Sequence, residues 1–361
     1  MPRHQDYPDQ VSYRRRSVLP PGLQTDIIKL SKAVQRNKNV HKRLSAYLSG
    51  IKALPAATVA RAATEIQAAA DPWRWWYEAN RFWVYLGIAR EPTLKAQIAA
   101  LTKYPALSHL YIFHGDGHLR EAALKCMIEP PDSPFVFAAV TYRLNDWVEQ
   151  VRDAAYECAS RLFPKASANT VADASFFLFT QIQHLGRWGA RERQILESAL
   201  YRRDVMEALT FLLMQRPTGR VATVMRYALS KHGLDHALPR LARMASLPHV
   251  RAIAYETLIF RRAQWVVGHQ HEWIDKSYGN RRRVPRFDRR TVNHYLNIEN
   301  LIADAARDRA VAVRKISARG LIDLRHELSS EMTEIGRLLS EDKSSSVRSR
   351  AQFYLKNLPD I

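Results

Sequence analysis

The stretch NDWVEQVRDAA, residues 145–155, places an acid, an aromatic ring and an arginine within a few positions of one another. Enzymes that flip a base out of nucleic acid use such groups, because rings and polar side chains hold the extruded base. The same groups suit the start of a helix, where an acid accepts hydrogen bonds from backbone N–H groups and matches the helix dipole. If the pattern recurs along the chain, it marks a structural joint and not a site, because a residue that recurs in each repeat stabilises the repeat.

A short polar turn, an apolar residue, an arginine and a helix recur at four other places along the chain. The four stretches are GDGHLREAAL (115–124), LPHVRAIAYETL (247–258), RDRAVAVRKISARGL (307–321) and EDKSSSVRSRAQFYL (341–355). The arginines of the five stretches are Arg120, Arg152, Arg251, Arg314 and Arg348. The distances in sequence between successive arginines are close to one, three, two and one times a period of roughly 33 residues. This period is typical of helical repeat arrays. We therefore interpret the opening stretch as a joint.

The succession of an Asp, then Val-Arg, then Ala-Ala resembles HEAT repeats, in particular the short bacterial HEAT-like kind. The resemblance covers about residues 90–358 and implies an all-α fold, an α-solenoid of HEAT-like helical hairpin repeats. It also implies that turn acids and the arginines that open each second helix link neighbouring units along a ladder. These residues are Asp116, Arg120, Asp146, Arg152, Asp308, Arg314, Asp342 and Arg348. The unit at 247–258 has His249 and no acid, which puts a ladder contact there in doubt.

The composition is typical of a helical protein of the reducing cytoplasm. Only 13 of the 361 residues are glycine, which favours helices joined by short loops because few turns need a positive φ. No run of alternating polar and apolar residues indicates a strand, so we predict none. The two cysteines, Cys126 and Cys158, are too few for a disulfide framework or a four-ligand zinc cluster. No apolar run predicts a signal peptide or a membrane span.

Changes in composition divide the chain into three predicted regions. Residues 1–22 are rich in Arg, Pro and polar groups and predict a basic disordered arm. Residues 23–90 predict an N-terminal helical region, and residues 91–361 predict the HEAT-like solenoid. A basic inserted loop at about residues 268–292 interrupts the solenoid. Inserted loops on one face are common binding sites of such arrays.

The formal net charge of +20 indicates an anionic partner, because it concentrates polyanions around the protein. The densest cationic stretch lies in the inserted loop, and arginine suits phosphate since its planar fork engages two oxygens. A second group lies in the arm and the first helix, along one helical side. The candidate anion-binding residues are Arg281, Arg282, Arg283, Arg286, Arg289, Arg290, Arg14, Arg15, Arg16, Lys29, Lys32 and Arg36. The alternative is a solvated charged surface with no specific partner.

Three further segments are candidates for a site. Residues 71–87, DPWRWWYEANRFWVYLG, are apolar almost all round a helix, which favours core or interface packing over base stacking. HGDGH at 114–118 and GHQHEW at 268–273 bring imidazoles together, but neither forms a complete zinc ligand set. No known nucleotide-binding or hydrolase motif occurs in the chain. We therefore predict no catalytic residue, no metal and no cofactor.

The patterns together favour a non-enzymatic cytoplasmic binding scaffold whose basic surface engages an anionic partner, with nucleic acid first and an acidic protein second. Two alternatives stay open. A protein adaptor, such as an inhibitor or immunity partner, would direct the positive charge against an acidic target. A HEAT-like DNA glycosylase would resemble this chain in fold type and charge, although no complete Trp, Asp and Arg set aligns with its site. The oligomeric state and any sequence specificity also stay open.

Overall fold

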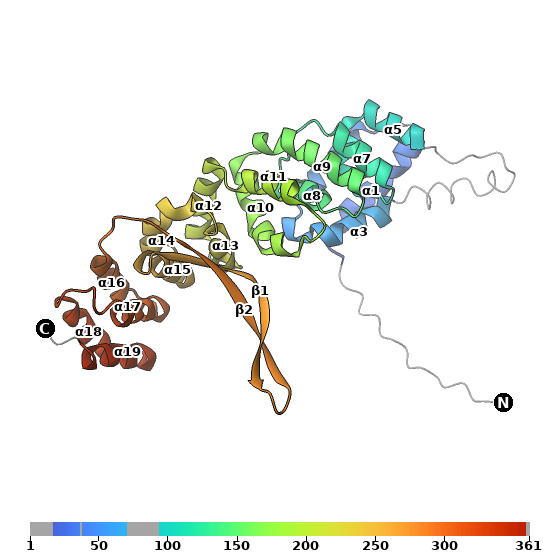
Figure 1. Cartoon of the computed structure of the whole chain (residues 1–361). Helices are drawn as coiled ribbons and strands as arrows, with labels where there is room; N and C mark the ends of the chain where they lie inside the picture. Colours follow the sequence, from blue (N-terminus) through green and yellow to red (C-terminus); the bar gives the residue numbers. More distant parts are fainter. Residues whose placement is uncertain (1–16, 37, 71–93, 359–361) are drawn as a thin grey trace, which may run out of the picture. The chain divides into compact units, whose positions relative to one another are not determined.

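The computed structural model describes residues 17–36, 38–70 and 94–358, which fold mainly into α-helices (Figure 1). Within these residues the strands form a two-stranded sheet. The chain divides into two compact units, Met1–Ile128 and Glu129–Ile361. Apart from the sheet, the mainly helical character predicted from the sequence is confirmed for the described residues. The domain boundary predicted after residue 90 falls outside them.

The first unit is built of short helices. The described ones are α1 (Pro21–Gln35), α2 (His41–Lys52), α3 (Val59–Ala70), α5 (Leu94–Lys103), α6 (Ser108–Tyr111) and α7 (Gly117–Cys126), with 3-10 turns at Ala56–Thr58 and Pro105–Leu107. Leu23, Ile27 and Leu30 recur at the helical spacing and are buried. Helix α1 therefore packs an apolar stripe against α2 and α3.

Residues 17–22, at the end of the predicted arm, are part of this unit. The backbone N–H groups of Val18 and Leu19 donate to Glu65 Oε2 on α3 at 3.0 and 3.1 Å. Burial alone would raise the pKa of Glu65, but these bonds, the one from Ser17 and the charge of Arg61 lower it. Helix α1 begins at Pro21, so the predicted arm is too long at this end. Its first 16 residues lie outside the described part of the chain.

The helices of the second unit pack on one another in chain order. They are α8 (Pro134–Arg143), α9 (Glu149–Leu162), α10 (Ala168–Gln181), α11 (Ala190–Leu200), α12 (Arg203–Gln215), α13 (Val221–Ala228), α14 (Leu238–Met244), α15 (Pro248–Ile259), α16 (Ile298–Ala306), α17 (Val311–Asp323), α18 (Met332–Ser340) and α19 (Ser345–Lys356). Short 3-10 turns lie at Phe163–Lys165, Ile182–His184 and His232–Ala237. Helices α13, α15, α17 and α19 contact one another in series, and α14, α16 and α18 pack beside them.

A long β-hairpin leaves the second unit between α15 and α16 (Figure 1). Its strands, β1 (Arg262–Asp275) and β2 (Asn280–Thr291), pair antiparallel. The segment predicted as an inserted loop at about 268–292 is therefore a β-hairpin, and the prediction of no strand is wrong. Both faces of the ribbon are largely exposed, so the sequence lacks the apolar–polar alternation that marks a half-buried strand.

Five arginines close the turn that precedes their own helix. Nη1 of each donates to the carbonyl oxygen six residues earlier. The acceptors are His114 for Arg120 (3.0 Å), Asp146 for Arg152 (3.0 Å), Ala245 for Arg251 (2.8 Å), Asp308 for Arg314 (2.9 Å) and Asp342 for Arg348 (2.6 Å). A guanidinium carries five donors in a rigid fork, so it can hold a turn and a second group at once. The stretch at 145–155 thus has the contacts of a joint.

The turn acids bind backbone N–H groups at the start of the same helices. A carboxylate oxygen accepts from the backbone N–H two residues later in four turns, and these N–H groups have no partner within the helix. The pairs are Asp116 and His118 (2.7 Å), Asp146 and Val148 (3.0 Å), Asp308 and Ala310 (2.7 Å), and Asp342 and Ser344 (2.8 Å). Asp146 also forms a buried ion pair with Arg143, at 2.6 Å between Nη1 and Oδ2.

Two of these arginines reach the acid of the following turn. Arg251 donates through Nε to Asp308 Oδ2 (2.7 Å) and through Nη2 to Oδ1 (2.9 Å). Arg314 forms the same fork with Asp342, at 2.5 and 3.1 Å. The sequence put a ladder contact in doubt for the unit with His249, and this doubt was misplaced. Arg251 needs an acid from the next unit along the chain, not from its own.

The two forked ion pairs, Arg251 with Asp308 and Arg314 with Asp342, favour the ionised form of each carboxyl group. Burial alone would raise the pKa of Asp308, but hydrogen bonds from Arg251 and from the Ala310 N–H outweigh this effect and lower it. The hydrogen bond from Arg314 lowers the pKa of Asp342. The Arg251 and Asp308 side chains are only 3% and 11% exposed. Removal of one partner would therefore leave a poorly solvated charge.

We expect Arg251→Ala to destabilise the second unit by about 3–5 kcal/mol, because Asp308 would stay buried without its partner. Arg152→Ala removes hydrogen bonds to carbonyls and should cost less, about 1.5–3 kcal/mol. Chemical unfolding of each variant measures both effects. Arg309→Ala, at an exposed neighbouring position, is the control and should stay within about 0.5 kcal/mol of wild type. An Arg251→Ala protein as stable as this control would contradict the role of the fork.

The lowered pKa values of Asp308 and Asp342 predict acid sensitivity. Each carboxyl has a lower pKa in the folded chain than in the unfolded chain. Its stabilisation is present above the unfolded pKa of about 4 and is lost as the pH falls through the folded pKa. Thermal unfolding midpoints between about pH 6 and pH 2 should therefore fall less steeply in an Asp308→Asn, Asp342→Asn double variant than in wild type. Equal slopes would show that these carboxyls do not contribute.

Candidate functional site

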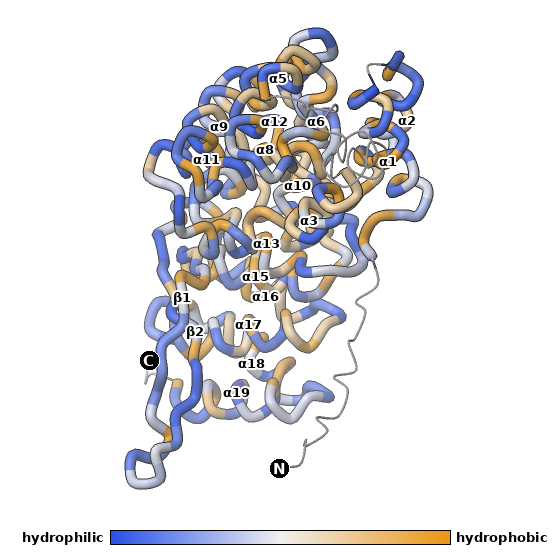
Figure 2. The backbone as a smooth tube through the Cα atoms, turned by 90° about the vertical axis from the view of Figure 1, so that its right-hand side faces the viewer, coloured by the Kyte–Doolittle hydropathy of each residue, from blue (hydrophilic) through white to orange (hydrophobic). Residues whose placement is uncertain are grey.

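The hairpin carries all six arginines predicted for the inserted loop, and every one of them lies on β2. At about 3.3 Å per residue, strands of this length extend about 40 Å. Figure 2 shows the ribbon mainly in the colours of hydrophilic residues. The turn at the base of the hairpin sets its position, and the strand register sets the distribution of its charges.

The base of the hairpin is built into the helices. Helix α15 ends at Ile259, and Arg261 takes a φ of 49°, a left-handed conformation that turns the chain into β1. The Val292 N–H donates to the Arg261 carbonyl oxygen at 2.9 Å and closes the two ends of the ribbon. Ala263 and Val292 are buried, and β1 contacts α13 and α15. The ribbon therefore leaves the helices in a fixed direction at its base.

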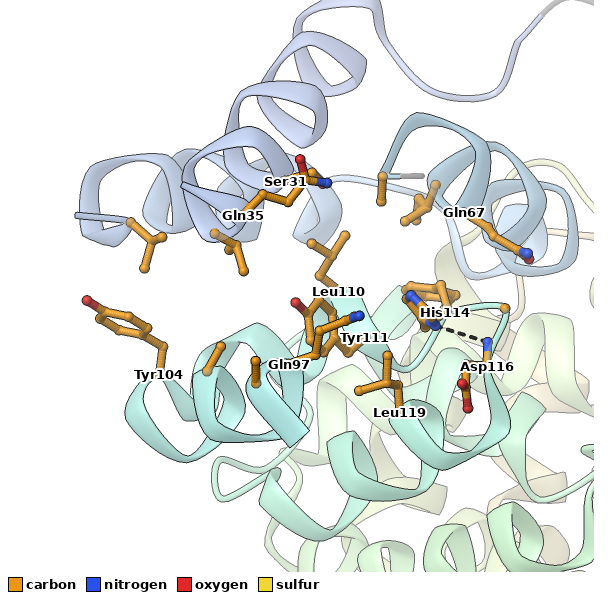
Figure 3. A pocket seen from close by; sticks show the side chains of 18 of the residues that line it. Ser31, Gln35, Gln67, Gln97, Tyr104, Leu110, Tyr111, His114, Asp116 and Leu119 are labelled. Atoms are coloured by element: carbon orange, nitrogen blue, oxygen red, sulfur yellow. Dashed lines mark hydrogen bonds between the residues drawn. The ribbon is translucent and has the colours of Figure 1, made fainter. Parts of the chain in front are cut away.

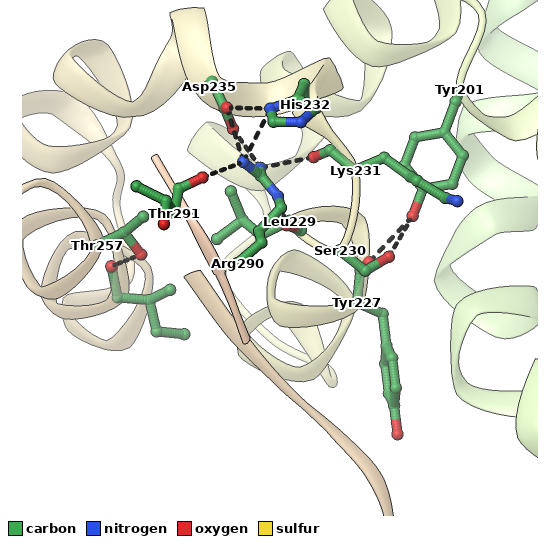
Figure 4. Close-up of polar contacts among 11 residues, drawn as sticks. Tyr201, Tyr227, Leu229, Ser230, Lys231, His232, Asp235, Thr257, Arg290 and Thr291 are labelled. Carbon is green, nitrogen blue, oxygen red and sulfur yellow. Dashed lines mark hydrogen bonds and ion pairs between the residues drawn. The ribbon is translucent and has the colours of Figure 1, made fainter. Parts of the chain in front are cut away.

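Arg290 anchors β2 to the end of helix α13 (Figure 4). Its Nε donates to the Leu229 carbonyl oxygen at 2.7 Å, and its Nη2 donates to the Lys231 carbonyl oxygen at 2.7 Å. Carbonyls at a helix end lack partners within the helix and favour a cation. The guanidinium also pairs with Asp235, and its side chain is only 13% exposed. Arg290, predicted from the sequence as an anion-binding residue, is therefore a structural anchor.

The strand register sorts the remaining charges between the two faces of the ribbon. Successive residues of a strand point to opposite faces, and paired residues share a face. Arg281 is paired with Trp273, Arg283 with His271 and Arg289 with Gln264. These pairs define the cationic face, which also carries Arg262 at the base. No carboxylate side chain of the two strands lies on it.

The opposite face is electrically balanced. Its arginines are Arg282, Arg286 and Arg290, and its acids are Glu272, Asp275 and Asp288. Arg282 donates to Glu272 Oε2 through Nε at 2.9 Å and through Nη2 at 2.7 Å. Three charges of each sign oppose one another here, so the net positive charge of the ribbon lies on the cationic face. We call this opposite side the balanced face.

Aromatic rings accompany the arginines of the cationic face. The Arg281 guanidinium lies over the Trp273 ring, 4.9 Å from its centroid. Phe287 is on the same face, and Tyr278 is in the turn between the strands. Trp273, Phe287 and Tyr278 are 48%, 49% and 85% exposed. Arginine and ring together bind anions and π systems, so the face can contact both phosphate and base.

The second predicted cationic group belongs to the first unit. Lys29 and Lys32 are on α1, and Arg36 follows its last residue as the C-cap. Lys29 and Arg36 are exposed, whereas Lys32 is half-buried. Arg14, Arg15 and Arg16 lie outside the described residues. The structure therefore places three of the six predicted hairpin arginines together on the cationic face, whereas the described cations of α1 belong to the other unit.

The histidine motifs have structural contacts. His114 Nδ1 accepts from the Asp116 N–H at 3.0 Å in the turn before α7. His269 and His271 lie on the cationic face, where Arg283 Nη2 is 3.2 Å from His269 Nδ1. Among the described residues, no group of three or more His, Cys, Asp or Glu side chains is placed to hold a metal ion.

The first unit contains a cavity of about 1190 Å³ between α1, α3, α5 and the segment of α6 and α7 (Figure 3). Its lining is largely apolar, as at Ile66 and Leu110, with amides such as Gln35 and Gln97 between. Such a lining suits an apolar group better than a phosphate. The Trp-rich segment 71–87, predicted to pack in a core or interface, lies outside the described residues.

Comparison with known proteins gives no family. No protein-family model matches the chain, and no curated protein is similar to it. No described helix is long and apolar enough to cross a membrane.

The sequence contained a signal for the cationic face. It was missed because the segment shows no alternation of apolar and polar residues. Every second residue from Arg281 to Arg289 reads Arg, Arg, Pro, Phe, Arg, which is a strand period in charge and aromaticity. The exposed rings Trp273 and Phe287 were not predicted as site residues. The anchor acid Asp235 had no signal, because it is 55 residues from Arg290 in the sequence.

We expect Asp235→Asn and Arg290→Met each to loosen the base of the hairpin while the helices stay folded. A hydrogen bond to a charged group contributes about 1.5–3 kcal/mol, so amide exchange should accelerate in β1 and β2 near Ala263 and Arg290. Hydrogen exchange read out by mass spectrometry measures this. The matched control is Arg286→Met, which removes the same charge from an exposed position of the strand. Equal exchange in all three variants would contradict the role of the anchor.

Proposed function

We propose that this chain is a non-enzymatic HEAT-like scaffold whose basic hairpin binds nucleic acid. The observation that carries the proposal is the sorting of charge, because three exposed arginines share a face that has no carboxylate. They are Arg281, Arg283 and Arg289. A random charged surface would mix both signs, as the balanced face does. The proposal assigns no catalytic residue.

The joints support the HEAT-like part of the proposal. The same turn acid and arginine recur with the same local hydrogen bonds, and helices α13, α15, α17 and α19 pack in series. A repeat array buries its core between neighbouring units and leaves insertions free to bind. The hairpin is such an insertion, since it enters and leaves between α15 and α16.

The chemistry of the cationic face favours phosphate. A guanidinium stays charged at any physiological pH and engages two phosphate oxygens through its planar fork. The exposed arginines lie two or more residues apart on β2, so they can follow a chain of phosphates. The net charge of +20 adds a long-range attraction for polyanions. Contacts of this kind bind with little sequence preference.

We expect an Arg281→Gln, Arg283→Gln double variant to bind DNA and RNA more weakly than wild type by a similar factor on unrelated sequences. Each lost phosphate contact should reduce the slope of log affinity against log salt by about 0.9 on duplex DNA and about 0.7 on single strands. Fluorescence anisotropy at several salt concentrations measures both effects. The matched control is Arg282→Gln, Arg286→Gln, which removes two charges from the balanced face and should change the slope less.

Three results would oppose the proposal. Wild-type protein that binds neither DNA nor RNA at low ionic strength, but binds an acidic protein, would favour the adaptor. Equal losses in the two double variants would show that total charge matters and the face does not. Release of a damaged base from DNA in the same mixtures would identify a glycosylase instead.

A further inference from the structure

The exposed rings of the cationic face do not follow from phosphate binding alone. Trp273 and Phe287 are each about half exposed, at 48% and 49%. A phenyl ring offers phosphate oxygens neither a cation nor a donor, and an indole offers them only its single Nε1–H group. A large exposed ring on a free ribbon is therefore a contact surface for something with a π face or an apolar surface.

The rings alternate with cations along the ribbon. Trp273 is opposite Arg281, and Phe287 lies six residues further along β2, past Arg283. At about 3.3 Å per residue the two rings are about 20 Å apart. Arg289 follows Phe287 by two residues, so it lies on the same face. From the tip toward the base, the order along the face is therefore Trp273 with Arg281, then Arg283, then Phe287, then Arg289.

We propose that the cationic face binds single-stranded nucleic acid, with unpaired bases stacked on Trp273 and Phe287 and phosphates held by Arg281, Arg283 and Arg289. This inference rests on the proposed function and specifies its substrate. Basic surfaces interleaved with aromatic rings bind single strands because every base has a π face. A further ring, Tyr278, is 85% exposed in the turn between the strands.

A continuous duplex can contact the arginines of the cationic face but cannot stack on its rings. Its phosphates face outward and would meet the arginines, but each base face is covered by the next base pair along the axis. Two rings about 20 Å apart would span about six stacked base pairs at a rise of about 3.4 Å. Neither ring could stack within them without unstacking a step, which costs a few kcal/mol. Unpaired bases expose the faces that the rings need.

The position of Arg281 fits this arrangement. Its guanidinium is 4.9 Å from the Trp273 ring centroid and holds the indole in place before any ligand arrives. Bases stack on guanidinium planes as well as on aromatic rings. The pair therefore presents a prepared stacking surface, while the N–H groups of Arg281, like those of Arg283 and Arg289, can still donate to phosphate. Trp273, Ile274 and Tyr278 lie exposed near the tip. A membrane surface is nevertheless a less suitable partner, because Phe287 lies about 20 Å further along the ribbon and could not enter the interface together with the tip.

The test compares the full-length protein on two labelled probes, an oligothymidylate of about 20 nucleotides and a blunt duplex of the same length. Fluorescence anisotropy at one salt concentration gives both affinities. We expect the single strand to bind more tightly. Trp273→Leu and Phe287→Leu, which keep apolar bulk but remove the ring, should each weaken single-strand binding roughly tenfold. Neither should change duplex binding.

Two controls separate stacking from folding. Phe287→Tyr keeps the ring and should bind the single strand like wild type. Val284→Ala, on the balanced face, removes apolar bulk without a ring and should also bind normally. Hydrogen exchange in β1 and β2 shows whether each hairpin remains formed. A Leu variant with an intact hairpin and a weakened single-strand affinity supports the inference.

The other outcomes are distinguishable. Equal affinity for the two probes, with no loss in the Leu variants, would overturn the stacking inference and leave the proposed function standing. Binding of neither probe at low salt would overturn both. Ring-dependent binding to phosphatidylserine vesicles, without binding to either probe, would also overturn both and identify an anionic membrane as the partner.

Discussion

The buried fork between Arg251 and Asp308 shows the constraint on which the second unit depends. One guanidinium donates to carbonyls of the turn before its own helix and to the carboxylate of the following turn. The same carboxylate accepts from the backbone at the start of the next helix. The turns at Asp308 and Asp342 are thus each held by their own arginine and by the previous one. Because a buried charge is costly without its partner, the turns cannot shift independently.

The hairpin inherits its orientation from this framework. It begins just after the end of α15, the helix that carries Arg251, and Arg290 fastens its second strand to the end of α13. Only the base is tied in this way, while the outer part of the ribbon remains exposed on both faces. The ribbon can therefore offer a complete face to a partner without breaking any helix contact. The arginines of the cationic face are positioned by strand pairing and not by ion pairs with carboxylates on that face.

Much of the helical architecture was predictable because its signals are local. A turn acid accepts from an N–H two residues away, and the joint arginine donates to a carbonyl six residues away. The hairpin was missed because neither of its faces is buried, so hydrophobic alternation was absent from the segment. The exposed rings were missed for a related reason. Trp273 and Phe287 are far apart in the sequence and share a face only through the register.

The sequence by itself determined the mainly helical class, the positions of the joints and the concentration of arginine between residues 281 and 290. Only the tertiary structure decided what each arginine does. Arg289 and Arg290 are neighbours in the chain, yet one is exposed on the cationic face and the other is nearly buried against Asp235. The physical reason is that strand pairing sends adjacent side chains to opposite faces. Which face meets the helices, and which meets solvent, is fixed by contacts between residues distant in the sequence.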